Sequence, residues 1–321
     1  MSQPVSREVE HEITVRAPAG ELYQFIADVE NWPRLFPPTV HVECLERSDN
    51  SERIQIWATA NGEAKTWTSR RVLDPDRHRV GFRQEKSQPP VGAMGGTWII
   101  EPDTDGQDAK SRVRLLHNYR AVDDDPDHLA WIDSAVDRNS QAELGALKAG
   151  AELAANSADL LLSFCDSVDV HGTAKDVFDF INEAQLWTQR LPHVSRVMLR
   201  EDTPGLQFLA MDTKTKDGSV HTTESVRVTF PHSKIVYKQI KVPPLMTLHT
   251  GEWLISENDD GVTVSSSHDV AINEANIAKF LGQSATIADA RSFIKDALSG
   301  NSMTTLRHAK RYAEAAGGDH E

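Results

Sequence analysis

The amino-acid sequence predicts an α+β protein of two tandem domains, each a curved antiparallel sheet wrapped around a long C-terminal helix with an interior pocket. Three observations lead to this prediction. The chain has 321 residues, about twice the length of an average domain. A set of sequence markers recurs in the same order about 155 residues later. Each half runs from short alternating strand patterns to one long apolar stripe of helical spacing.

The repeat spans nearly the whole chain. Trp32 and Trp187 lie 155 residues apart, and Arg71 and Arg227 lie 156 residues apart. An aromatic helix motif, a Pro-Pro pair, a Gly-x-Trp motif and a histidine recur at similar spacings. Chance would not preserve the order and spacing of so many markers, so the halves are a tandem duplication. The two domains are predicted at 1–156 and 157–321.

Each half begins with a strand and a helix. Their copies are expected at about 9–16 and 18–27 in the first domain and at about 164–171 and 173–182 in the second. A turn that carries the tryptophan follows, and then alternating strands separated by Asp-Asn, Asn-Gly, Asp-Gly and Pro-Pro breaks. Such breaks are typical of hairpins in an antiparallel sheet.

Each half ends with a long helix whose apolar stripe is interrupted by one serine. The first stripe contains Leu129, Ile132, Val136, Ser140, Leu144 and Leu147, and the second contains Ile294, Leu298, Ser302, Leu306 and Ala309. About eleven extra residues precede the second helix, within 273–285. They favour two interpretations equally, a lid turn built on Ile277, Phe280 and Leu281 or a simple extension of the helix.

The composition excludes several classes of protein. A net charge of −14 is unfavourable for binding nucleic acid or an anionic membrane. No apolar run approaches the roughly 18 residues of a membrane span, and the polar first residues are unlike a secretory signal. Cys44 and Cys165 are the only cysteines, too few for a disulfide framework or a zinc site, and they fit a reducing cytoplasm. Neither a phosphate loop, a dinucleotide fingerprint nor a spaced His/Cys cluster occurs, so no cofactor and no metal are predicted.

The most informative candidates are two arginines, Arg71 and Arg227, which strand alternation turns toward the pocket. A buried guanidinium is costly unless it meets a partner. One interpretation is an ion pair with a nearby carboxylate, and the other is an anchor for an oxyanion or enolate. Ser69 and Ser225 lie two residues earlier on the same face. They could donate to a carbonyl or be ordinary strand serines.

His117 and His268 lie on the inward face of the last strand of their halves. Histidine titrates near neutral pH, so each could shuttle protons, and a structural role is an equal alternative. Aromatic side chains are core residues first, but they could also line a flat ligand. The candidates for substrate contact are Trp32, Trp67, Trp98, Tyr119, Trp187, Thr223 and Trp253.

Together these residues resemble a known family. The Trp67-x-Ser69-x-Arg71 strand, the Trp32–Phe36 turn and the order of elements are similar to those of bacterial polyketide aromatase/cyclases. Two copies in tandem resemble the didomain aromatase/cyclases of type II polyketide synthases, which belong to the helix-grip superfamily of START-like (SRPBCC) domains. The resemblance covers about 8–155 and 160–315.

The resemblance implies cyclisation, dehydration and aromatisation of the first ring of a poly-β-ketone without a cofactor. The substrate would be held on an acyl carrier protein after reduction at one carbonyl, so the ketoreductase and ketosynthase of the pathway are further expected partners. For this chemistry we expect Arg71 and Arg227 to polarise a carbonyl or enolate. We expect Ser69 and Ser225 to orient that oxygen or a water, and His117 or His268, or a water held by them, to shuttle protons.

The sequence departs from the family in two places. Single-domain members have a tyrosine seven residues after the turn tryptophan, where this chain has Thr39 and Val194, so a phenol acid from that position is absent. Thr223 stands where the first half has Trp67, which predicts a wider or more polar second pocket. The two domains therefore need not share one task.

Two alternative functions remain on the sequence alone. One is a non-catalytic carrier or sensor of hydrophobic small molecules. Two inward arginines would be energetically unfavourable in the purely apolar pocket of such a protein. The other is a stress or chaperone-cofactor protein on the same fold. Because carrier proteins are acidic, an acidic cyclase must dock through local basic residues. The candidates are Arg34, Arg70, Arg77, Arg79, Arg83, Lys234, Lys238 and Lys241.

Overall fold

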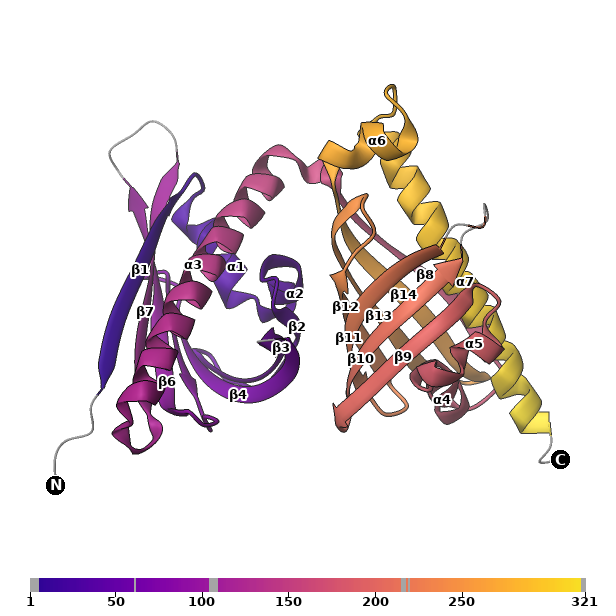
Figure 1. Cartoon of the computed structure of the whole chain (residues 1–321), viewed down its shortest axis with the longest axis horizontal. Coiled ribbons are helices and arrows are strands. Elements are labelled where there is room, and N and C mark those ends of the chain that lie inside the picture. The colour runs from indigo at the N-terminus through magenta and orange to yellow at the C-terminus, as the bar shows by residue number, and fades with distance from the viewer. Residues whose placement is uncertain (1–5, 61, 104–108, 215–217, 219, 319–321) are drawn as a thin grey trace. The chain divides into compact units, whose positions relative to one another are not determined.

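The computed structural model describes residues 6–318 except 61, 104–108, 215–217 and 219. It divides the chain into two compact units, Met1–Ser157 and Ala158–Glu321 (Figure 1). The division falls one residue after the predicted domain boundary, at the end of a long helix. Each unit combines one antiparallel seven-stranded sheet with helices, so the predicted α+β class and tandem helix-grip architecture are confirmed.

The first unit has its strands in the order β1-β7-β6-β5-β4-β3-β2. The strands are β1 (Arg7–Val15), β2 (Thr39–Arg47), β3 (Ser51–Ala60), β4 (Glu63–Asp74), β5 (Arg79–Gln84), β6 (Val91–Asp103) and β7 (Lys110–Ala121). The helices are α1 (Ala19–Ala27), α2 (Trp32–Leu35) and α3 (Pro126–Asn156), with short 3₁₀ turns at η1 (Val29–Asn31) and η2 (Val122–Asp124). Strands β2 to β7 form a meander, and β1 pairs with β7.

The second unit repeats this topology, in the order β8-β14-β13-β12-β11-β10-β9. Its strands are β8 (Leu161–Val170), β9 (Val194–Thr203), β10 (Leu206–Lys214), β11 (Val220–Phe230), β12 (Lys234–Lys241), β13 (Met246–Asn258) and β14 (Gly261–Ile272). Its helices are α4 (Ala174–Asn182), α5 (Trp187–Arg190), α6 (Ile277–Leu281) and α7 (Ile287–Gly318), with 3₁₀ turns η3 (Ala158–Leu160), η4 (Ala184–Leu186) and η5 (Glu274–Asn276).

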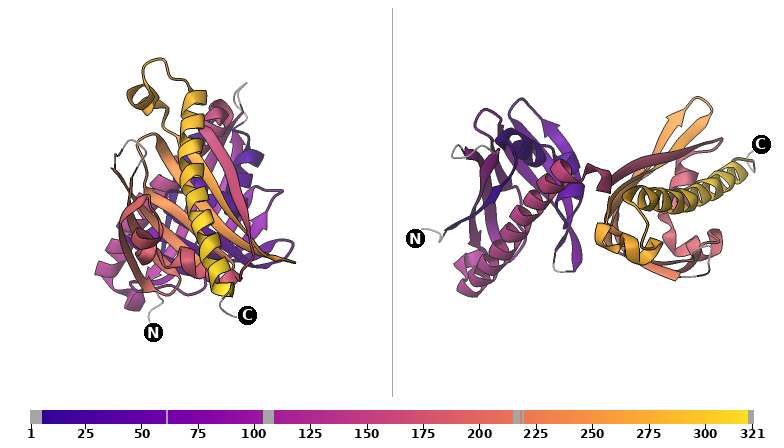
Figure 2. Two further views of the ribbon diagram at one scale, coloured as in Figure 1. Left: turned by 90° about the vertical axis from the view of Figure 1, so that its right-hand side faces the viewer. Right: turned by 90° about the horizontal axis from the view of Figure 1, so that it is seen from above.

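Each sheet curves around its own long helix, α3 in the first unit and α7 in the second (Figures 1 and 2). The predicted stripes face the sheets, because Ile132, Val136, Ser140, Leu144 and Leu147 of α3 and Ile294, Ser302, Leu306 and Ala309 of α7 are buried. Helix α3 begins where the Asp125 carboxylate accepts the backbone N–H groups of Asp127 and His128, a typical N-cap. The serine in each stripe therefore points into the protein.

The inward faces of the last strands also agree with the prediction. On β7, Val113, Leu115 and Tyr119 are buried, and on β14, Val264, Ser266, His268 and Val270 are buried. Trp98, Trp187 and Trp253 belong to the hydrophobic cores of their units. These tryptophans are core residues, as the sequence indicated.

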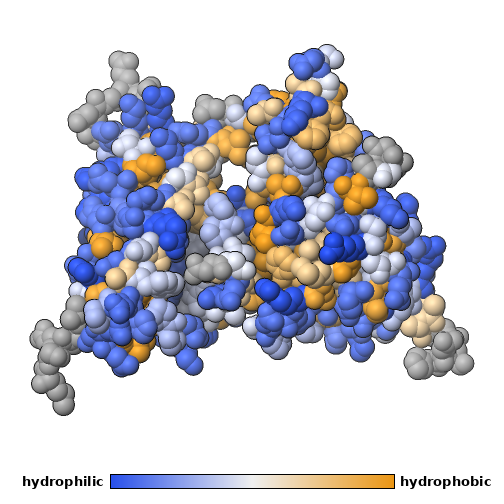
Figure 3. Space-filling model, viewed as in Figure 1, coloured by the Kyte–Doolittle hydropathy of each residue, from blue (hydrophilic) through white to orange (hydrophobic). Residues whose placement is uncertain are grey.

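The extra residues of the second unit form a separate short helix, α6, between β14 and α7. The interpretation as a simple extension of the long helix is therefore wrong, because α7 begins only at Ile287. Asn276 Nδ2 donates to the Pro244 carbonyl oxygen at 2.7 Å, which ties this segment to the turn between β12 and β13. Phe280 is 44% exposed, and apolar residues are visible around α6 in Figure 3.

Within the described part of the chain, no helix has both the length and the apolar character needed to cross a membrane. Cys44 and Cys165 are free and exposed.

Candidate functional site

One row of residues crosses the inner face of each sheet and contains the predicted arginine and histidine. Directly opposed residues of antiparallel strands lie on the same face, about 5 Å apart at Cβ. In the first unit the paired positions are Glu52, Arg71, Phe82, Gly96, His117 and Val9. In the second unit they are Gln207, Arg227, Tyr237, Gly251, His268 and Phe164. The register thus aligns groups that lie far apart in the sequence.

Arg71, the second member of the first row, is 1% exposed. Its Nη2 donates to the carbonyl oxygens of Ile26 and Ala27, both at 3.0 Å. Its Nη1 lies 3.6 Å from Glu52 Oε2, and its guanidinium lies over the Trp32 ring, 5.1 Å from the centroid. Burial lowers the pKa of Arg71 to about 10, so the group remains charged at neutral pH. Arg71 holds the C-terminal end of α1, where carbonyls lack helical partners, and it has a buried counter-ion.

Arg227 occupies the same position in the second row with different partners. Its Nη2 donates to the Ile181 carbonyl oxygen at 2.8 Å, and its guanidinium lies 5.3 Å from the centroid of the Trp187 ring. Burial lowers the pKa of Arg227 to about 10, against the opposing charge of Glu201. Its Nη1 has no hydrogen-bond partner among the residues that the structure describes, and Gln207 replaces the carboxylate found at Glu52. The ion-pair interpretation therefore describes Arg71, whereas Arg227 has no carboxylate at the paired position; Nη1 of each arginine lacks a hydrogen-bond partner among the described residues.

Gly96 and Gly251 allow an aromatic ring of the neighbouring strand to lie across them. A Cβ at Gly96 would lie 2.5 Å from Phe82 Cζ, and a Cβ at Gly251 would lie 2.5 Å from Tyr237 Oη. Both would also collide with a carbonyl oxygen of the next strand. The Gly-x-Trp motif of the repeat thus has a steric cause, since only glycine leaves room for the ring beside the histidine.

His117 is half-buried, and its ring lies edge-on to Phe82, 5.5 Å between centroids. Its Nδ1 is 3.3 Å from Ser140 Oγ, the serine that interrupts the stripe of α3. Burial, with a smaller contribution from His11, lowers the pKa of His117 to about 4, so the ring is neutral at pH 7. The row members nearest to His117 are Val9, Gly96 and Phe82, none of which has a polar side chain.

His268 is buried in a larger hydrogen-bonded network. Its Nε2 lies 2.7 Å from Ser302 Oγ of α7 and 3.2 Å from Ser266 Oγ. Its Nδ1 lies 3.0 Å from both Tyr237 Oη and His249 Nε2. Burial lowers the pKa of His268 to about 4 and that of His249 to about 3, and burial raises the pKa of Tyr237 above its usual value. All three groups are therefore uncharged at neutral pH.

The two serines two residues before the arginines are buried on the same inner face. Ser69 Oγ donates to the Arg83 carbonyl oxygen at 3.0 Å, which links β4 to β5. This hydrogen bond supports the interpretation of Ser69 as an ordinary strand serine. For Ser225 no such hydrogen bond to the described residues occurs.

The aromatic candidates lie in several settings. Trp32 Nε1 donates to the Ile26 carbonyl oxygen at 3.2 Å, and Trp187 Nε1 donates to the Phe180 carbonyl oxygen at 3.3 Å. Trp67 is half-buried on β4 and packs against a small apolar cluster. Thr223 is half-buried at the corresponding place on β11. Trp67 is therefore less buried than the core tryptophans Trp98, Trp187 and Trp253.

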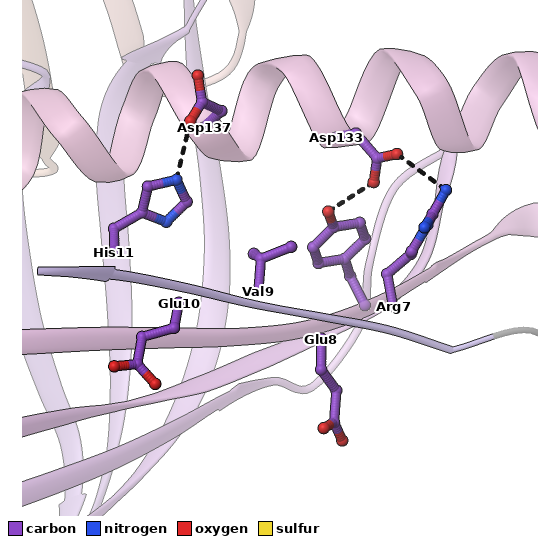
Figure 4. A pocket seen from close by; sticks show the side chains of 8 residues that line it. Arg7, Glu8, Val9, Glu10, His11, Asp133 and Asp137 are labelled. Atoms are coloured by element: carbon purple, nitrogen blue, oxygen red, sulfur yellow. Dashed lines mark hydrogen bonds and ion pairs between the residues drawn. The ribbon is translucent and has the colours of Figure 1, made fainter.

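Tyr119 lines a polar pocket of about 480 Å³ between β1 and α3 (Figure 4). Its hydroxyl donates to Asp133 Oδ1 at 2.6 Å, so this phenol already has a partner. Figure 4 shows His11 and Arg7 pointing toward Asp137 and Asp133 of α3, and distances of 2.9 Å and 3.5 Å join these pairs. Val9, which pairs with His117 at the β1 end of the first row, is one of the residues that line this pocket.

Several of the basic residues expected to meet a carrier protein are already paired. Arg70 forms ion pairs with Glu85 at 2.9 Å and Glu46 at 3.5 Å. Arg77 pairs with Asp74, and Lys241 pairs with Glu224, each at 3.4 Å. Arg83 donates to Asn118 Oδ1 at 3.0 Å, and Lys238 is buried. Paired or buried charges attract an acidic partner less than free ones.

Comparison with known proteins connects this geometry to a family. The family of polyketide cyclases/dehydrases and lipid-transport proteins matches residues 6–152. The bifunctional cyclase/dehydratase of the granaticin polyketide synthase from Streptomyces virginiae is 49% identical over 298 residues, 92% of this chain and 97% of that protein. The corresponding protein of the actinorhodin polyketide synthase from Streptomyces coelicolor is 44% identical, covering 99% of both chains. The chain belongs to the polyketide cyclase/dehydratase family.

Solved structures agree with this assignment. The crystal structure of the di-domain ARO/CYC BexL from the BE-7585A biosynthetic pathway shares 60% identity with this polyketide cyclase/dehydratase, with a TM-score of 0.90 over 96% of this chain and 99% of that chain. The di-domain ARO/CYC StfQ from the steffimycin biosynthetic pathway shares 35% identity, with a TM-score of 0.87 over 97% and 99%. The resemblance to didomain aromatase/cyclases is confirmed, and the protein is an enzyme rather than a carrier or sensor.

Sequence reasoning missed two members of the second network, Tyr237 and His249. Strand alternation places them on the inner face, but it does not show that they meet His268. One signal could have found the phenol: Gly251 breaks an otherwise bulky strand pattern opposite Tyr237, as Gly96 does opposite Phe82. Among the predicted residues, the two histidines do meet the stripe serines.

Proposed function

We propose that this polyketide cyclase/dehydratase closes and aromatises the first ring of a ketoreduced poly-β-ketone held on an acyl carrier protein. A C–H between two carbonyls loses its proton, the enolate carbon attacks another carbonyl, and loss of water makes the ring aromatic. The protein must bend the chain, stabilise enolate charge and move protons. The row of arginine, aromatic ring, glycine and histidine across each sheet is the observation that carries this proposal.

The arginines supply the positive charge. Both stay protonated at neutral pH despite their burial, because a pKa of about 10 leaves a wide margin. An enolate oxygen beside a buried guanidinium is stabilised more strongly than in water, because little solvent screens the pair. Arg227 is the better placed of the two, because Gln207 stands where the Glu52 carboxylate pairs with Arg71. Ser225, on the same face, orients the same oxygen, and Arg71 and Ser69 act in the first domain.

The histidines move protons between substrate atoms. A neutral imidazole accepts on one nitrogen and donates from the other, so a ring of low pKa can pass a proton without staying charged. Ser140 and Ser302 fix the orientation of His117 and His268. The half-buried Trp67 lines the first domain, and Thr223 leaves the second domain wider at that place.

The partners follow from the substrate. The acyl carrier protein delivers the chain, and the ketoreductase and ketosynthase of the same pathway act before this enzyme. All of these act in the cytoplasm, where we place this protein. Arg79 is a candidate for contact with an acidic carrier.

Reconstitution tests the proposal. Ketosynthase, carrier protein and ketoreductase are combined with and without this protein, and the products are identified by mass spectrometry and NMR. We expect a first aromatic ring only when the protein is present. An identical product pattern in both reactions overturns the proposal.

Variants then test the arginines. Arg227→Ala should lower aromatised product by about 100-fold, the size typical of a lost oxyanion donor. Arg227→Lys keeps the charge without the planar fork and should retain part of the activity. Arg138→Ala, an exposed change on α3, is the control. Normal aromatisation by a folded Arg227→Ala, judged by circular dichroism, contradicts the assignment.

A further inference from the structure

The two domains differ most at the phenol of the second row. The buried network of the second domain contains Tyr237, His249, Ser266, His268 and Ser302. The positions equivalent to the first three in the first domain are Phe82, Met94 and Leu115, and only the histidine and the helix serine are shared. The phenol is thus a property of the second domain alone.

The hydrogen-bonding partners determine where the protons lie. His249 Nδ1 is buried, and no atom of the described part of the chain forms a hydrogen bond with it. A buried N–H without an acceptor costs more than an unused lone pair, so His249 carries its proton on Nε2. That N–H faces His268 Nδ1 at 3.0 Å, so His268 Nδ1 holds the lone pair and His268 Nε2–H donates to Ser302 Oγ at 2.7 Å.

This arrangement leaves one donor to spare. The His268 Nδ1 lone pair is 3.0 Å from Tyr237 Oη as well as 3.0 Å from His249 Nε2. Two donors therefore compete for one acceptor. When the His249 N–H takes it, the Tyr237 hydroxyl proton is free for another oxygen. The His249 N–H can also reach the phenol oxygen, at 3.5 Å, and would stabilise it as it loses a proton.

Tyr237 is the least buried of the three ring side chains in the network. His249 and His268 are 2% and 4% exposed, whereas Tyr237 is half-buried. Tyr237 is directly opposite Arg227 in the pairing of β12 with β11. The proposed enolate anchor and the spare hydroxyl are therefore neighbours on one face, about 5 Å apart at Cβ. A substrate oxygen held by Arg227 lies within reach of the phenol.

We propose that Tyr237 is the proton donor of the second domain, and that His249 positions it. The inference rests on the proposed function and adds the residue that protonates the leaving oxygen. In the dehydration step the phenol proton passes to the departing hydroxyl as the C–O bond breaks, and water leaves. The electron pair of the adjacent C–H bond forms the new C=C bond. The phenolate left behind takes the carbon's proton, which regenerates the phenol, so atoms and charge balance.

Only the second domain therefore carries out this acid-dependent dehydration. The first domain has Arg71 and His117 but no hydroxyl donor between them, since Phe82 occupies the place.

The reconstituted full-length enzyme tests this with Tyr237→Phe, a change that removes only the hydroxyl and reproduces the first domain. We expect aromatised product to fall by at least about 100-fold, within the range for a lost general acid. A ring-closed product that keeps its hydroxyl should accumulate. Tyr312→Phe, on the exposed face of α7, is the matched control and should behave as wild type.

His249 needs a readout that separates positioning from folding. His249→Met reproduces Met94 and should lower aromatised product about tenfold. His249→Gln, whose amide N–H can take the place of Nε2–H, should restore most of the activity, which a merely structural role would not predict. Circular dichroism and melting temperature confirm the fold of each variant.

The outcomes separate the two proposals. Wild type that gives no aromatic ring overturns the proposed function itself. Wild type that aromatises, together with a folded Tyr237→Phe that aromatises at the same rate, overturns only the role of Tyr237. Loss of ring closure in Tyr237→Phe, without accumulation of the hydroxylated ring, also contradicts it.

Discussion

Replacing Gly251 with alanine disturbs the centre of the second row. The added Cβ would lie 2.5 Å from Tyr237 Oη and 2.7 Å from Tyr237 Cζ, and it would collide with the Ser267 carbonyl oxygen. That carbonyl belongs to β14, which is paired on both sides, so it cannot easily move. The Tyr237 ring must therefore leave its place beside His268.

The expected loss of stability can be estimated from these contacts. Overpacking of this kind costs about 1–3 kcal/mol, and a lost hydrogen bond of the phenol costs about 1 kcal/mol more. We therefore expect the free energy of unfolding of the second domain to fall by roughly 3 kcal/mol. For a domain of this size each kcal/mol lowers Tm by about 2–4 °C, so the fall should be roughly 6–12 °C.

Thermal unfolding of the full chain, followed by circular dichroism and calorimetry, measures this change. Gly300→Ala is the matched control in the same domain, because nothing lies within 4 Å of its added Cβ in α7. There alanine should stabilise the helix by up to about 1 kcal/mol, since it is the better helix former. An unchanged Tm for Gly251→Ala, or the same change in both variants, would refute the packing argument.

Three further predictions concern stability. Ser302→Ala should cost about 1–2 kcal/mol in urea unfolding because it leaves His268 Nε2–H without its 2.7 Å acceptor, and Ser140→Ala should cost less, since its contact is 3.3 Å long. Acidification from pH 7 to pH 5 should destabilise the protein, because the pKa of His268 is about 4 in the folded chain and about 6.5 when unfolded. At pH 5 the unfolded chain binds a proton that the folded chain does not, which lowers the free energy of unfolding by ~2 kcal/mol; above about pH 7 this effect vanishes. Equal free energies of unfolding at both pH values would contradict this prediction. Glu52→Gln should lower the free energy of unfolding by roughly 3 kcal/mol, because a buried ion pair then loses one partner. Glu63→Gln, at an exposed ion pair, is the control and should change it little. Equal effects of the two changes would argue against the buried pair.

The fold could be predicted in detail because its signals are local or repeated. The alternation of β7 and β14 gave the correct inward faces, and the stripe spacing gave both long helices. The one wrong interpretation concerns the segment before α7. Its length could be counted from the repeat, but whether it extended the helix or formed a separate one depended on the contact of Asn276 with the turn at Pro244.

The site could be predicted only in part, because its residues form a row that crosses several neighbouring strands. Alternation shows which face a residue occupies, but not which residue of the next strand lies opposite. Arg227 and His268 could be found singly from the repeat. Their alignment with Tyr237 depends on the register of three strand pairs, which no short pattern in the sequence specifies. The partners of Arg71 were missed for the same reason, since Glu52 lies on another strand.

The second network is difficult to explain as a device for stability. The first domain fills the same positions with Phe82 and Met94, so the fold does not require Tyr237 and His249 there. Buried polar groups contribute little net stability, and one left without a partner costs free energy. The second domain bears that cost, since His249 Nδ1 has no hydrogen-bond partner in the regions covered by the structure. A polar network at a position where apolar residues fold equally well, with a spare hydroxyl opposite a buried arginine, is best explained by proton transfer to a bound substrate.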